Sequence, residues 1–324
     1  MWAKCALRKP FAAIVWVGIV LAVSIHYSCV AFNSAGQGHT RGGNLNLLFR
    51  HAASKKQDNY EIDTTFTYRD LPREMTLYIL DGTAMLHRCY YSKYREERLV
   101  NRGGQFIDTG ALIEFSERVA HFLVTVRPKY VAMCFDEPRT TWRHIIYPQY
   151  KQNRPPKPKE LESQLEMAPR VARALGLKTF SHGGFEADDV MATLAAWARG
   201  APRLSAVVAS NDKDLLQLVG DRVFAMDPST LRLSGAEEVR ARLGVGPAQV
   251  VDLLALQGDS ADNVPGVRGV GPKTARALLA AFGDLDEVFR QADAGGVAAL
   301  GGGGSSGSSS KKNSPPPRRR RRHL

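Results

Sequence analysis

Short apolar segments that end in aspartate constrain the fold of this 324-residue chain more than any other feature. Runs of strand-forming residues at 76–80 and 130–135 lead directly into Asp81 and Asp136, and the run at 204–209 is separated from Asp212 by Ser210 and Asn211. A fourth strand is predicted at 223–226, and helical periodicity occupies 109–125, 160–175 and 190–198. Strands that alternate with helices predict an α/β fold with a mostly parallel central sheet flanked by helices. Ligands of such sheets bind beyond the carboxyl ends of the strands, so the three aspartates are expected to share one site.

A second acidic feature opens the helix predicted at 190–198. Glu186, Asp188 and Asp189 stand within four residues, at the first turn of that helix. One acid there needs no explanation, because acidic side chains favour the positive end of the helix dipole. Three acids repel one another unless something positive neutralises them. Hard cations such as Mg²⁺ take carboxylate oxygens as ligands, so the cluster predicts a metal site.

Charge is distributed unevenly along the chain, although the formal net charge is +12. Residues 1–74 hold nine basic and five acidic side chains, residues 301–324 hold seven and none, and residues 75–300 hold 28 and 27. Within the balanced part, 139–159 contains six basic residues and no acid. This separation predicts a polyanion-binding surface beside a cation-binding one. The four cysteines, Cys5, Cys29, Cys89 and Cys134, follow no spacing typical of a disulfide framework or a zinc site.

The N-terminal part is typical of targeting sequences. Residues 1–31 combine basic residues, an apolar run at 11–25 and a small-x-small cleavage pattern at 29–31, which predicts a signal peptide. Residues 32–74 have transit-peptide composition and then a polar linker. Together they resemble the bipartite presequences of algae whose plastids lie inside extra membranes, so a plastid location is expected. A mitochondrial location, an ordinary secreted protein and a single membrane anchor are the alternatives.

The region after 246 differs from the α/β part. A helix at 247–256, an acidic turn at 258–263 and the glycine-rich string 266–275 precede a further helix that ends at 282. Backbone N–H groups of such a string, at a helix start, suit a phosphate. This arrangement predicts a helix-hairpin-helix that binds nucleic-acid backbone without reading bases, with a plain interhelical turn as the alternative. The Gly/Ser- and Arg-rich tail, 295–324, is predicted to be disordered.

Several of these motifs, in this order, resemble the 5′-3′ exonuclease family, the flap-endonuclease-like domain at the N-terminus of bacterial DNA polymerase I. The resemblance rests on Asp81-Gly82, Phe135-Asp136, Glu186-Ala187-Asp188-Asp189, Asp212-Lys213-Asp214-Leu215 and the stretch 258–267. It implies a PIN-like nuclease domain with an arch at 75–234 and a helix-hairpin-helix (H3TH) DNA-binding domain at 235–294.

The resemblance also implies residue roles in a divalent-metal phosphodiesterase. Two Mg²⁺ ions, which Mn²⁺ can replace, would activate water and stabilise the leaving oxygen. The first ion would be held by Asp81, Asp136, Glu186 and Asp188, and the second would be held or oriented by Asp189, Asp212, Asp214, Asp259 and Asp262. In the arch segment, Lys151, Arg154 and Arg143 would be catalytic, the first two by stabilising phosphoryl charge. The alternative for Lys151 and Arg154 is a solvated arch that only positions the substrate.

DNA contacts are implied for two further groups. They comprise Arg88, His87 and Tyr90 near the first aspartate, and Arg268, Gly269, Gly271, Lys273 and Thr274 in the hairpin, where K⁺ would also bind. His87 is a departure, because bacterial members usually have tyrosine there. No polymerase region follows, which indicates a stand-alone nuclease or a truncated gene model.

The expected function is therefore a 5′-3′ exonuclease or 5′-flap endonuclease in organellar DNA replication and repair. Its substrates would be DNA with 5′ flaps, nicks or RNA primers, with no small-molecule cofactor. A monomer that works with a separate DNA polymerase is expected. Two alternatives are a catalytically inactive, structure-specific DNA-binding protein and an RNA-directed nuclease of similar fold.

Overall fold

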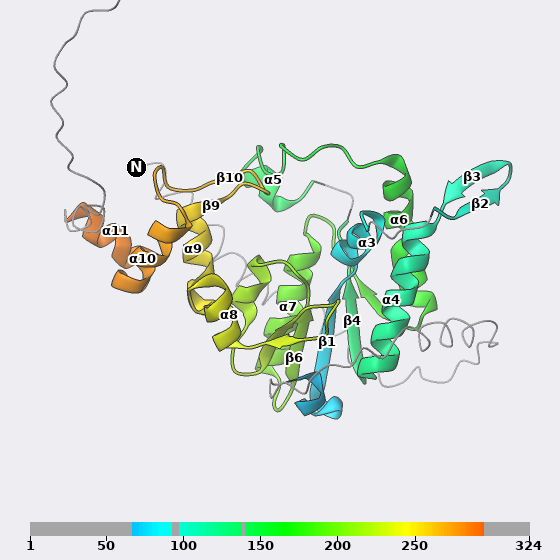
Figure 1. The fold of residues 1–324 in the computed structure, drawn as a ribbon, viewed down its shortest axis with the longest axis horizontal. Coiled ribbons are helices and arrows are strands. Elements are labelled where there is room, and N and C mark those ends of the chain that lie inside the picture. The colour runs from blue at the N-terminus through cyan, green and yellow to red at the C-terminus, as the bar shows by residue number, and fades with distance from the viewer. Residues whose placement is uncertain (1–66, 93–96, 138–139, 295–324) are drawn as a thin grey trace, which may run out of the picture.

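The computed structural model describes residues 67–92, 97–137 and 140–294, which form an α/β unit followed by a helical unit (Figure 1). The predicted signal peptide, most of the transit-like segment and the Arg-rich tail lie outside the described residues. Within the described part, the helices are too short or too polar to cross a membrane.

A six-stranded sheet organises the α/β unit in the order β5-β4-β1-β6-β7-β8, and its pairings are parallel except for that of β8. The strands are β1 (Thr76–Asp81), β4 (Tyr130–Cys134), β5 (Lys178–Phe180), β6 (Ser205–Ala209), β7 (Val223–Met226) and β8 (Leu233–Ser234). Leu80 of the central strand lies opposite both Met133 and Ala209, so β1, β4 and β6 end at the same level. The predicted mostly parallel sheet is confirmed, and its carboxyl edge brings the strand-end aspartates together.

Helices cover both faces of this sheet. One face packs against α3 (Gly82–Tyr90), α4 (Gly110–Val126) and α6 (Lys159–Ala174), and the other packs against α7 (Ala187–Gly200). Side chains of β1 alternate between the two layers: Tyr78 and Leu80 belong to one core, and Ile79 belongs to the other. The near-continuous apolar run of β1 follows from this burial on both faces.

Several elements were not predicted from the sequence. They are the projecting hairpin of β2 (Leu99–Arg102) and β3 (Gln105–Asp108) and the short α5 (Trp142–Ile146), all labelled in Figure 1, and the edge strands β5 and β8. Two short 3₁₀ turns, η2 (Tyr68–Asp70) and η3 (Arg73–Met75), precede β1. Leu71 is buried in the core and Thr67 pairs with Arg232, so the folded unit begins before the predicted start at 75.

The helical unit packs around its own apolar core. It contains α8 (Ala236–Leu243), η5 (Pro247–Gln249), α9 (Val250–Gln257), α10 (Pro272–Phe282) and α11 (Leu285–Asp293). The 3₁₀ turn η4 (Asp214–Leu218), which links β6 to β7, adds Leu216 to this core. The helix predicted at 247–256 is therefore a 3₁₀ turn followed by α9. The predicted hairpin also contains a two-stranded ribbon, β9 (Gly258–Asp259) with β10 (Val264–Pro265). A Cβ on Gly258 would stand 2.4 Å from the nitrogen of Gly266, so glycine is required where these backbones meet.

Candidate active site

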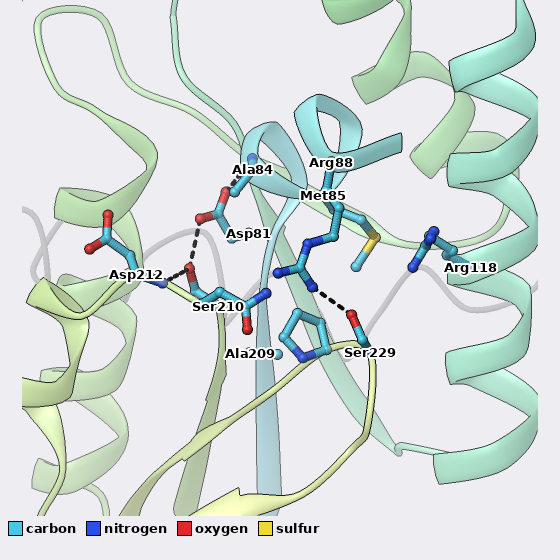
Figure 2. A pocket seen from close by; sticks show the side chains of 11 residues that line it. Asp81, Ala84, Met85, Arg88, Arg118, Ala209, Ser210, Asp212 and Ser229 are labelled. Atoms are coloured by element: carbon cyan, nitrogen blue, oxygen red, sulfur yellow. Dashed lines mark hydrogen bonds between the residues drawn. The ribbon is translucent and has the colours of Figure 1, made fainter. Parts of the chain in front are cut away.

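Asp81 is the anchor of the site, because it ends β1 and caps α3. Its carboxylate accepts hydrogen bonds from the Ala84 N–H at 2.8 Å and from the Ser210 hydroxyl at 3.0 Å (Figure 2). Only 6% of the residue is exposed. Burial, with help from the charges of Asp136 and Asp212, raises the pKa of Asp81 to about 6.

Two more carboxylates come from neighbouring elements at the same edge of the sheet. Asp136 follows β4, and its Oδ1 accepts a 2.7 Å hydrogen bond from the Ala187 N–H at the start of α7. Asp188 lies in the first turn of α7. Burial raises the pKa of Asp188 well above its ordinary value, and the nearby charges of Asp81 and Asp212 raise it further. The predicted meeting of strand-end and helix-start acids is thus present in the structure.

A second acidic group surrounds a cavity of about 330 Å³ beside the first group. The acids that line it are Asp212, Asp214, Asp259 and Asp262, with the cations of Arg154, Lys213 and Arg242 on the same walls. Burial raises the pKa of Asp214 to about 7, with further contributions from Asp212 and Asp259. In the part of the chain that the structure describes, Oδ1 of Asp214 is buried and has no hydrogen-bond partner.

The chemistry of these donors fits divalent cations. Hard ions such as Mg²⁺ bind carboxylate oxygens, and an orphaned buried carboxylate oxygen such as that of Asp214 needs a positive partner. The described residues contain no three His, Cys, Asp or Glu side chains already close enough to surround an ion. The fit therefore rests on donor type, burial and mutual repulsion, and not on a preformed cage.

Other predicted ligands are paired with basic side chains. Lys151 Nζ lies 3.0 and 3.1 Å from the two oxygens of Glu186. Arg154 Nη2 lies 2.5 Å from Asp262, and the hydroxyl of Tyr150 lies 2.9 Å from both Glu186 and Asp262. The two basic residues predicted to face the scissile phosphate thus stand directly at the carboxylates.

The remaining pair on the second group joins Lys213 to Asp259 at 3.0 Å. Lys151, Arg154 and Lys213 thus neutralise Glu186, Asp262 and Asp259, whereas no salt bridge within the described residues joins a basic side chain to Asp214 or to the acids of the first group.

Asp189 does not join either acidic group, and its predicted part in holding or orienting the second metal stays a prediction. Arg143 grips both of its oxygens, at 2.6 and 2.9 Å, and Trp142 Nε1 donates to it at 3.3 Å. Asp189 also accepts a 3.0 Å hydrogen bond from the N–H of Glu186, the N-cap residue of α7, and so forms half of the capping box of that helix. Arg143 is held by this pair, so its predicted catalytic role stays a prediction.

The three predicted DNA contacts on α3 face different surroundings. His87 lies near Lys157 and Asp136, and burial lowers its pKa. Arg88 lines a cavity of about 250 Å³ that Asp81 and Asp212 also line, and it donates to the Ser229 hydroxyl at 2.5 Å (Figure 2).

Tyr90 is half-buried, packs against the main core and meets the ring of Tyr91 edge-on. Of these three side chains, His87 is the one close enough to the arch residues Lys157 and Arg154 to feel their charge.

The glycine-rich turn lies apart from the carboxylates. Its predicted DNA contacts, Arg268, Gly269, Gly271, Lys273 and Thr274, are all exposed, between β10 and the first turn of α10. Gly269 has a φ of +83°, and Gly271 caps α10 just before Pro272. An exposed helix N-terminus with free space around its glycines can receive a phosphate closely.

Sequence reasoning missed two functional positions. Ser210 accepts a hydrogen bond from the Asp212 N–H and donates one to Asp81, so it ties two strand ends together. Tyr150 bridges Glu186 and Asp262. Ser210 could have been found as the polar residue directly after a strand. Tyr150 carries no such signal beyond its place next to Lys151.

Comparisons with known proteins agree with this geometry. Residues 76–244 match the family model of the 5′-3′ exonuclease N-terminal resolvase-like domain, and residues 245–303 match that of the 5′-3′ exonuclease C-terminal SAM fold. DNA polymerase I of Treponema pallidum (strain Nichols) is 40% identical over 228 residues, which cover 68% of this chain and 22% of the polymerase. The 5′-3′ exonuclease of Aquifex aeolicus (strain VF5) is 35% identical over 215 residues, 66% of this chain and 72% of that one.

A solved structure is also similar. The bacteriophage T5 flap endonuclease, in a pseudo-enzyme-product complex with DNA and metal ions, superposes with a TM-score of 0.54 at 22% identity, over 67% of this chain and 78% of that one. This likeness supports the fold. The chain spans about a fifth of the length of the polymerases that it matches. With both family models matched in order over the described fold, the chain belongs to the 5′-3′ exonuclease family.

Proposed function

We propose that this protein is a divalent-metal-dependent 5′-3′ exonuclease and 5′-flap endonuclease that hydrolyses phosphodiester bonds of DNA. One observation carries the proposal. Strand ends and a helix start bring Asp81, Asp136, Asp188, Asp212 and Asp214 together, and three of these have raised pKa values. Such a concentration of negative charge, part of it buried, opposes folding unless cations occupy it.

In this proposal, Asp81, Asp136, Glu186 and Asp188 hold one Mg²⁺, and Asp212, Asp214, Asp259 and Asp262 hold the other, with Mn²⁺ as a substitute. The ions would supply an activated water and charge stabilisation at the leaving oxygen. Ser210 and the Ala84 N–H orient Asp81, and the Ala187 N–H orients Asp136. These hydrogen bonds keep the two carboxylates in place.

Lys151 and Arg154 have a second task when a substrate is present. In the structure they neutralise Glu186 and Asp262. A bound phosphodiester would compete for the same two cations, which would then stabilise the negative charge that develops on it. The exposed turn at 268–274 is positioned to hold the duplex backbone, with K⁺ as a proposed additional ion there.

The proposed substrates are DNA with 5′ flaps, nicks or RNA primers. The structure of the similar T5 flap endonuclease contains DNA and metal ions, which supports DNA as the substrate proposed for this protein. A monomer that acts beside a separate DNA polymerase, in organellar replication and repair, is the proposed setting. A plastid location, with mitochondrion as the alternative, is proposed from the composition of residues 1–74. A fluorescent fusion of those residues tests the location.

Incubating the protein with a labelled 5′-flap duplex and Mg²⁺ tests the activity. We expect cleavage that EDTA abolishes and that an Asp188→Ala, Asp212→Ala double variant loses. Full activity in the double variant would refute the metal assignment. Metal-independent flap binding without cleavage would instead favour an inactive DNA-binding protein. Cleavage rates measured side by side on a DNA flap and an RNA flap decide which of the two polymers is the substrate.

A further inference from the structure

Tyr150 lies between Glu186, which is close to Asp188 of the first acidic group, and Asp262 of the second, although no feature of the proposed chemistry requires a tyrosine. It lies in the irregular segment between α5 and α6, and only 7% of it is exposed. Its hydroxyl lies 2.9 Å from Oε2 of Glu186 and 2.9 Å from Oδ2 of Asp262. Glu186 belongs to the α/β unit and Asp262 to the ribbon turn of the helical unit, so one side chain links both.

The phenol proton limits what this contact can be. A tyrosine hydroxyl carries one proton and stays protonated at neutral pH, so it donates to one carboxylate at a time. The hydroxyl oxygen then lies 2.9 Å from an oxygen of the other carboxylate with no proton between the two atoms. Such a contact needs positive charge nearby, and Lys151 lies 3.0 Å from Glu186 while Arg154 lies 2.5 Å from Asp262.

The backbone around Tyr150 holds it in this position. Lys151 has a φ of +57°, which is uncommon for a residue with a side chain, and its N–H donates to the carbonyl of Asp262 at 3.0 Å. Asn153 Nδ2 donates to the carbonyl of Ser260 at 2.7 Å. The segment is therefore fastened to the ribbon turn by contacts that do not involve the phenol.

The ring of Tyr150 has its own packing. Lys151 Nζ lies 4.8 Å from the ring centroid and the Arg143 guanidinium lies 6.0 Å from it, within the range of cation–π attraction. His144 meets the ring edge-on at 5.3 Å. Because these contacts use the ring and not the hydroxyl, removing the oxygen alone leaves the side chain seated.

We infer that Tyr150 is a positioning residue whose hydroxyl sets Glu186 and Asp262 relative to each other, and thereby couples the two metal-binding groups across the two structural units. The inference rests on the proposed function for what the groups bind. Without the hydroxyl, the two carboxylates repel more freely and the ions lose their preset geometry. Residues that orient metal ligands typically change metal affinity or activity by about 10-fold or more when they are replaced.

The test compares Tyr150→Phe with Tyr147→Phe in the full chain. Tyr147 is a matched control, because its hydroxyl donates at 3.1 Å to the backbone carbonyl of Asn263 in the same turn and makes no hydrogen bond to a carboxylate among the described residues. Calorimetric titration with Mn²⁺ alone, without DNA, measures metal binding, and thermal unfolding confirms that both variants are folded. Flap cleavage then gives kcat and KM.

We expect Tyr150→Phe to weaken Mn²⁺ binding by about 10-fold and to lower kcat with little change in KM for DNA, whereas Tyr147→Phe matches the wild type. Equal Mn²⁺ affinity in all three proteins, or equal weakening in both variants, would overturn the inference. A wild type that binds Mn²⁺ but cleaves no flap would refute the proposed function alone. A wild type that binds no Mn²⁺ would refute both.

Discussion

Replacing Asp214 with asparagine should stabilise the metal-free protein at alkaline pH. The carboxylate has a buried oxygen without a partner among the described residues, and its pKa is raised from 3.8 to about 7. A raised pKa means that the folded state binds the proton more tightly than the unfolded state does. The resulting loss of stability is absent below the unfolded pKa, grows as the pH rises from about 4 to about 7, and is complete above that.

The size of the effect follows from the displacement of the pKa. At about 1.4 kcal/mol per pKa unit, a shift from 3.8 to about 7 corresponds to about 4 kcal/mol. Asp214 is only partly buried, so solvent screening reduces this to about 2 kcal/mol. For a folded unit of this size, that corresponds to a rise in Tm of about 4 to 8 °C.

Differential scanning calorimetry in EDTA at pH 8 and pH 5 measures this effect. We expect Asp214→Asn to melt higher than the wild type at pH 8, with a smaller difference at pH 5. Adding Mg²⁺ should then stabilise the wild type more than the variant. A variant that melts lower than the wild type at pH 8, or a difference that does not shrink in acid, would refute the reasoning. Ser163→Ala, at a half-buried position on α6 that lies outside the site, provides a control.

Three other predictions follow from the packing. Arg143→Met should lower the free energy of unfolding, measured by denaturant titration, by about 3 kcal/mol, because it leaves the buried Asp189 carboxylate without its cationic partner. Adding Asp189→Asn should recover part of this loss, and additive losses in the double variant would contradict the pairing. Gly258→Ala should disrupt the ribbon of β9 and β10, because the φ of this residue is +76° and a Cβ there would lie 2.4 Å from the backbone nitrogen of Gly266. We expect the variant to lose flap binding while its α/β unit stays folded, and normal flap binding would contradict this prediction. Cys89 and Cys134, both buried with raised thiol pKa values, should react with a thiol reagent only after unfolding, so fast labelling of the native protein would be inconsistent with this core.

Local sequence patterns determined the central part of this fold. The run from Thr76 to Leu80 is apolar and rich in strand-forming residues because β1 is covered on both faces, and that burial is visible in the composition itself. The aspartates that end β1 and follow β4 and β6 could be placed together from sequence, since parallel strands end at one edge. The helix of α7 and the acids that open it were likewise readable from periodicity.

Short elements depended on their neighbours instead. The β5 strand has three residues and β8 has two, too few for a periodic signal, and each exists because an existing strand offers it hydrogen bonds. The ribbon of β9 and β10 is equally short. It forms where two glycines let backbones approach, which the spacing in the sequence does not reveal.

Tertiary structure alone decided how the acids divide their work. Asp188 and Asp189 are adjacent in sequence, but neighbours on a helix point about 100° apart, so only one can face the strand ends. Asp188 does so, and Asp189 turns to Arg143. The sequence by itself determined that carboxylates gather at the carboxyl edge of a parallel sheet. Which of them bind a protein cation, which stay buried without one, and which tyrosine joins the two groups depend on side-chain directions and on contacts between distant segments.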